Sequence, residues 1–170
     1  MKKTAAIKSA AVTLLASLSL ASGYVGAHGN ETHSKKADAP ISQDEHPFGK
    51  QGDPKKAKRT ITVDMTDNMR FTPGEITVKE GETIRFVVAN KGKMMHEMVI
   101  GTMDELKKHG ELMKKHPTME HDEPYMSHVA PGKKEDLVWQ FSKAGEFYYA
   151  CLIPGHFEAG MIGKIKVVKG

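Results

Sequence analysis

Hydrophobic and polar residues alternate along most of the chain after Arg59. The alternating segments are Ile61 to Met65, Ile76 to Val78, Ile84 to Val88, Leu137 to Phe141, Glu146 to Cys151 and Gly163 to Val168. A period of two residues is typical of strands that bury one face, and glycine-containing turns such as Pro73-Gly74 separate the segments. About seven short strands in roughly 110 residues predict an all-β sandwich.

The connection from about residue 102 to 131 departs from this alternation. Thr102 and Glu105 have the spacing of a capping box, and Pro117 would end a helix that begins there. Apolar residues between them recur on one helical face, namely Met103, Leu106 and Met113. We therefore predict a short helix within an insert in the sandwich.

The first 58 residues differ from the rest of the chain. Residues 1–27 combine a basic start, a short apolar stretch and small residues before His28, which predicts a cleaved signal peptide and export to the periplasm. The apolar stretch is shorter than the roughly 18–20 residues that span a bilayer, so we expect no membrane span. Residues 28–58 are polar without a sustained period and predict a flexible arm, leaving residues 59–170 as the folded domain.

The charge of the chain gives no reason to expect a nucleic-acid partner. The formal net charge is +4, and removal of residues 1–27 would take Lys2, Lys3 and Lys8 with it. The remaining charges are nearly balanced, whereas nucleic-acid-binding domains usually carry a basic excess.

Cys151 is the only cysteine, which is informative in an exported protein. An exposed free thiol would be oxidised in that compartment, so Cys151 is either a buried, inert residue or a metal ligand. His156 and Met161 follow it in one loop and favour the second alternative, because thiolate, imidazole and thioether donors suit copper. The missing second imidazole is best supplied by His96, which begins a predicted strand.

The segment from Gly145 to Val167 resembles the cupredoxins, or blue copper proteins. It has the form Gly-x-Phe-x-Tyr-x-Cys-x-x-Pro-Gly-His-x-x-x-Gly-Met-x-Gly-x-Ile-x-Val, and its Cys-x4-His-x4-Met spacing is similar to that of auracyanin and rusticyanin. The segment from Phe71 to Phe86 also resembles the opening hairpin of that family. The resemblance implies a Greek-key sandwich with a mononuclear type 1 copper site, whose ligands would be His96, Cys151, His156 and Met161.

One position departs from the family pattern. Many cupredoxins have an asparagine after the first histidine ligand, where it links the two ligand-bearing loops, but this chain has Glu97. The hydrogen bonds around the copper, and with them the reduction potential, are therefore not predictable from the resemblance.

The chain also has an unusual number of other soft donors, with 11 methionines and 9 histidines. Met98, Met103 and Met113 are expected to fill the core. Others could hold accessory Cu(I) or Cu(II), since thioether and imidazole groups bind both ions. These candidates are His28, His109, Met113, His116, Met119, His121, Met126 and His128. The alternative is that they are ordinary solvated or packed side chains.

Two functions agree with these features. A periplasmic copper-tolerance protein would use the soft donors to bind or deliver copper, whereas a soluble electron carrier would need only the four-ligand site. Copper is the expected cofactor in both, with redox or copper-transfer proteins as partners. An enzyme is not expected, because the chain has no His-x-His pair and Cys151 is flanked by Ala150 and Leu152.

Overall fold

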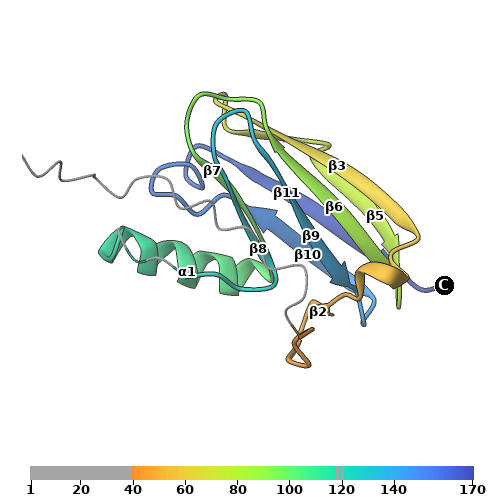
Figure 1. Cartoon of the computed structure of the whole chain (residues 1–170). Coiled ribbons are helices and arrows are strands. Elements are labelled where there is room, and N and C mark those ends of the chain that lie inside the picture. The colour runs from red at the N-terminus through yellow and green to blue at the C-terminus, as the bar shows by residue number, and fades with distance from the viewer. Residues whose placement is uncertain (1–39, 118, 120) are drawn as a thin grey trace, which may run out of the picture. The chain divides into compact units, whose positions relative to one another are not determined.

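The computed structural model describes residues 40–117, 119 and 121–170, which form a two-layered β-sandwich with an α-helix beside it (Figure 1). The predicted signal peptide, His28 and the first part of the predicted arm lie outside the described residues. Among the described residues, no helix has the length and apolar character needed to cross a membrane.

The first sheet contains six strands. In spatial order these are β1 (Glu45–His46), β2 (Gly49–Gln51), β9 (Lys134–Gln140), β6 (Thr83–Asn90), β3 (Arg59–Thr66) and β4 (Arg70–Thr72). β3 and β6 are parallel and the other neighbours are antiparallel. A 3-10 helix, η1 (Pro54–Lys56), connects β2 to β3.

The second sheet contains five strands. In spatial order these are β5 (Glu75–Lys79), β11 (Ile162–Val168), β10 (Gly145–Ala150), β7 (His96–Gly101) and β8 (Met126–Val129). β5 and β11 are parallel and the other neighbours are antiparallel. The chain changes sheet repeatedly between β4 and β10, which brings β7 and β10 side by side although about 50 residues separate them.

The main core lies between the two sheets and follows the alternation in the sequence. In β5 the side chains of Ile76 and Val78 are buried while their neighbours are exposed. The largest buried side chains of this core include Trp139, Tyr149 and Phe86. The all-β sandwich expected from the sequence is confirmed.

The predicted helix is also confirmed, as α1 (Met103–Lys115) with the Thr102–Glu105 capping box at its start. Leu106 of α1 packs on the second sheet in a smaller apolar cluster with Val99, Met126, Ala150 and Leu152. Figure 1 shows α1 beside β7 and β8. The helix therefore covers part of the sheet that carries the predicted copper ligands.

Two expectations about which segments lie outside the sheets were wrong. Residues 45–56, predicted to lie in a flexible arm, form β1, β2 and η1, and Phe48 is buried beneath Trp139, whose indole N–H donates to the Phe48 carbonyl at 2.9 Å. The predicted insert is also not wholly a connection, because its last part forms β8, which pairs with β7. Neither segment has the long apolar period by which strands are predicted, so their burial depends on tertiary contacts.

Candidate metal centre

Three of the predicted ligands meet at one end of the sandwich. His96 begins β7, Cys151 follows β10, and His156 lies in the loop between β10 and β11. One ligand atom from each of these three residues lies within 4.8 Å of the other two. The pairing of β7 with β10 brings the first two together, since Ala150 is opposite Val99.

His96 is fully buried, and one of its two ring nitrogens contacts a carboxylate. Its Nε2 lies 3.0 Å from Asp67 Oδ1, and the Asp67 carboxylate also accepts the Lys93 N–H at 2.8 Å. These hydrogen bonds lower the pKa of Asp67, the backbone contact with Lys93 having the largest effect. Among the residues that the structure describes, His96 Nδ1 is a buried nitrogen without a hydrogen-bond partner. A buried nitrogen of this kind is costly unless it binds something, which fits a metal ligand held in place by a carboxylate on its other nitrogen.

Cys151 is the predicted central donor. Its thiol is buried, its Sγ lies 3.2 Å from His156 Nδ1, and it accepts the Glu97 N–H at 3.5 Å. Burial, and after it the charge of the nearby Glu97 carboxylate, raise the pKa of the thiol to about 12. The thiol is therefore protonated at neutral pH without a metal, and a metal that binds the thiolate must displace this proton.

His156 and Met161 are placed by a compact loop. The Met161 N–H donates to the His156 carbonyl at 3.0 Å, and the Cys151 N–H donates to the Met161 carbonyl at 3.1 Å. Gly155, at a φ of 91°, makes the turn before His156 in a conformation that other residues rarely adopt. Met161 is fully buried, whereas His156 is partly exposed and its pKa is lowered by burial and by the proximity of His96. The hydrogen bonds therefore hold the backbone of Met161 beside that of Cys151, and the loop carries a neutral imidazole at His156.

Glu97 links the two segments that carry the predicted ligands. Its side chain is buried, with Oε1 accepting the Leu152 N–H at 2.7 Å and Oε2 lying 3.0 Å from His128 Nε2. The carboxylate thus joins the start of β7 to the residue after Cys151, which is the role that asparagine has in the cupredoxins that the sequence resembles. Neither this bridge nor the contact between His96 and Asp67 was predicted, because each joins residues far apart in the chain.

The ion pair with Glu97 predicts a pH dependence of stability. The Glu97 carboxylate raises the pKa of His128 above its usual value of 6.5, so the folded protein binds this proton more tightly than the unfolded chain. The resulting stability is fully present below about pH 6.5 and is lost as the pH rises through the folded-state pKa. Replacing His128 with glutamine should therefore destabilise the copper-free protein more at pH 6 than at pH 9.

Urea unfolding of the wild type and this variant across that range measures the effect. His116→Gln is the control, because His116 is exposed at the end of α1. A His128→Gln destabilisation that is the same at every pH would contradict a charged pair with Glu97.

The accessory candidates do not gather at one place. Met126 is fully buried in the apolar cluster under α1, and Met113 is also buried. Both are therefore core residues, which agrees with one of the two predictions made for Met113 and was not predicted for Met126. His128 is paired with Glu97, and His116 is exposed at the C-cap of α1. The remaining three described candidates, His109, Met119 and His121, line a pocket between α1 and the segment before β8.

Comparison with known proteins identifies a copper-binding family. Residues 57–168 match the family model for copper binding proteins of the plastocyanin/azurin family. The "Copper-resistant cuproprotein CopI" of Rubrivivax gelatinosus is 50% identical over 139 residues, covering 82% of this chain and 84% of that protein. The protein of the same name from Pseudomonas aeruginosa is 37% identical over 152 residues, covering 71% of this chain and 82% of that protein.

Solved structures show the same fold. Auracyanin from Roseiflexus castenholzii superposes with a TM-score of 0.57 at 24% identity, over 66% of this chain and 98% of auracyanin. Auracyanin B superposes with a TM-score of 0.60 at 18% identity, over 74% of this chain and 99% of that protein. The family match, the relatives and the fold lead to one conclusion: the chain belongs to the plastocyanin/azurin family of copper binding proteins, the cupredoxins.

Proposed function

We propose that this cupredoxin acts in copper resistance in the periplasm, by holding copper that would otherwise harm the cell. The observation that carries the proposal is the 50% identity to a copper-resistant cuproprotein over 84% of that protein's length. The predicted signal peptide supports the location.

The copper is held by His96, Cys151, His156 and Met161 in a type 1 site. The grouped ligand atoms of the first three and the unpartnered, buried Nδ1 of His96 support this assignment. Copper supplies one-electron chemistry between Cu(I) and Cu(II) when it is bound. The protein's part is to fix the donors in advance: Asp67 orients His96, and the loop hydrogen bonds hold His156 and Met161 beside Cys151.

Growth of a deletion strain in graded copper tests the function. Cells without the gene should stop growing at a lower copper concentration than the wild type, and the intact gene should restore growth. Cys151→Ser should fail to restore it at equal protein level, because a serine hydroxyl is a poor ligand for copper in this donor set. Full rescue by Cys151→Ser would show that the proposed site is not needed for resistance.

Electron transfer is the second candidate. The supporting observation is the rigidity of the ligand set: His96, Cys151 and Met161 are all buried, so the donors need rearrange little when the copper changes oxidation state. The partly exposed His156 gives an electron a short route to the surface. Loss of a respiratory or photosynthetic electron-transfer step in the deletion strain, without copper sensitivity, would favour this candidate.

We also infer that the protein is not an enzyme. Cupredoxin oxidases and nitrite reductases use additional histidine ligands, in His-x-His pairs or beside the cysteine. Cys151 has Ala150 and Leu152 as its neighbours, and the sequence contains no His-x-His pair.

A further inference from the structure

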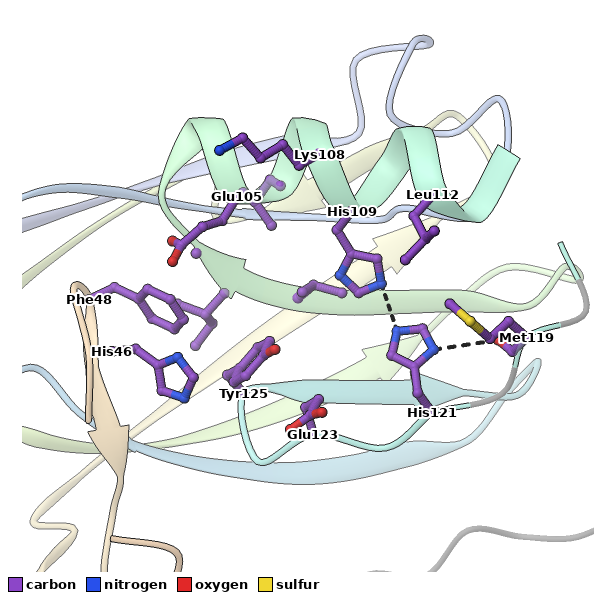
Figure 2. Close-up of a pocket in the computed structure, with 14 residues that line it drawn as sticks. His46, Phe48, Glu105, Lys108, His109, Leu112, Met119, His121, Glu123 and Tyr125 are labelled. Carbon is purple, nitrogen blue, oxygen red and sulfur yellow. Dashed lines mark hydrogen bonds between the residues drawn. The ribbon is translucent and has the colours of Figure 1, made fainter. Parts of the chain in front are cut away.

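A pocket of about 370 Å³ lies between α1 and the segment that precedes β8, apart from the site at Cys151. Figure 2 shows His109 reaching into it from α1 and His121 reaching toward His109 from the opposite segment. Met119 lines the same pocket and is 37% exposed. The pocket thus brings together two imidazoles and a thioether from two separate segments.

The two imidazoles face each other through their Nε2 atoms, which lie 2.6 Å apart. The ring centroids are 4.6 Å apart and the rings are inclined at 46°, so the rings meet nitrogen to nitrogen and are not stacked. Two unprotonated nitrogens would repel each other at this distance, and the contact therefore needs either a shared hydrogen or a cation between the lone pairs.

The surroundings of His121 favour one tautomer of its ring, and those of His109 favour a neutral ring. His121 Nδ1 lies 3.4 Å from the Met119 carbonyl, and a hydrogen bond there places the proton on Nδ1 and leaves the Nε2 lone pair directed at His109. This arrangement is common among histidine ligands, which donate their second ring N–H to a carbonyl or carboxylate. Burial and the neighbouring His121 lower the pKa of His109, so its ring is neutral at physiological pH.

We propose that His109 Nε2, His121 Nε2 and the thioether of Met119 form a second copper site, selective for Cu(I) and open to solvent. Imidazole and thioether together suit Cu(I), and the set contains no thiolate or aspartate ligand that would favour another ion. The two Nε2 atoms are now 2.6 Å apart. To bind one first-row metal ion through bonds of about 2.0–2.1 Å, they would have to move apart by less than about 1 Å more. His121 lies on a connecting segment outside the sheets, where such a shift is small.

The proposed site contains fewer donors than the set predicted from the sequence. Met126 is excluded because it is packed in the cluster under α1, and His128 because its Nε2 is paired with Glu97. His46 lines the far end of the pocket, but its ring packs against Tyr125 with centroids 4.9 Å apart. The second site adds copper capacity to the proposed resistance function, and its binding does not depend on Cys151.

Anaerobic titration with Cu(I) against a chromophoric Cu(I) chelator tests the proposal. The His109→Asn/His121→Asn double variant should retain one equivalent of Cu(I) fewer than the wild type. His116→Asn is the matched control, because it removes an exposed histidine at the end of the same helix, and it should retain as much as the wild type. Met119→Leu should release Cu(I) from this site at a lower chelator concentration.

Two further variants keep the result interpretable. Replacing His109 in the double variant could disturb α1, whereas His121→Asn alone changes only a partly buried side chain outside the sheets. The single variant should lose the same equivalent of Cu(I) as the double variant. Cys151→Ser should lose a different equivalent, so failure of the proposed type 1 site would not be mistaken for failure of this one. If His121→Asn and the double variant both retain as much Cu(I) as the wild type, the second site does not exist.

Discussion

Glu97→Ala should destabilise the protein by about 3 kcal/mol, because it removes a buried acceptor and leaves two partners behind. The Leu152 N–H would lose its 2.7 Å hydrogen bond, and His128 would lose the carboxylate 3.0 Å from its Nε2. A buried donor without a partner costs about 1–3 kcal/mol, and loss of one member of a buried ion pair costs about 3–5 kcal/mol. His128 is 28% exposed, so water recovers part of the second cost.

Chemical unfolding of the copper-free protein measures this effect. Glu97→Gln should cost less, because its amide oxygen can still accept the Leu152 N–H although the charge is lost. Glu80→Ala is a matched control at an exposed glutamate and should change stability by less than about 0.5 kcal/mol. A Glu97→Ala variant as stable as this control would show that the carboxylate does not hold the two ligand-bearing segments together.

The proposed ligand loop could be recognised in the sequence because it is local. Cys151, His156 and Met161 lie within one loop, and the spacing of donor types is itself the signal. The start of α1 was predictable for the same reason, since the residues of the capping box are only three positions apart. His96 required one tertiary assumption, the pairing of its strand with the strand before Cys151, and the structure contains that pairing.

Contacts between distant residues were not predictable in this way. Phe48 follows no alternating pattern, yet it stacks on Trp139 with centroids 5.3 Å apart, and this contact orders a segment expected to be flexible. Met126 lies in a polar stretch that suggests exposure, but β8 pairs with β7 and places its side chain under α1. The contact between His109 and His121 likewise depends on how the segment after α1 folds back.

Cys151 is the residue whose replacement should have the largest effect on the copper centre. A Cu(II) ion bound by its thiolate absorbs visible light through transfer of charge from sulfur to copper, and a serine oxygen cannot replace that transition. His96 and His156 would remain near the ion, so Cys151→Ser could still bind Cu(II) weakly through nitrogen. Met161→Leu, which leaves the thiolate in place, is the matched control within the same loop and should keep the band, with its position changed.

The visible absorption of the Cu(II)-loaded protein, measured beside Cys151→Ser at equal copper content, tests the central claim most directly. The wild type should be intensely blue or green, and the serine variant should lose this band while its fold, followed by circular dichroism, is retained. A wild-type Cu(II) complex without an intense visible band, or a band that survives in Cys151→Ser, would contradict a copper site built on His96, Cys151, His156 and Met161.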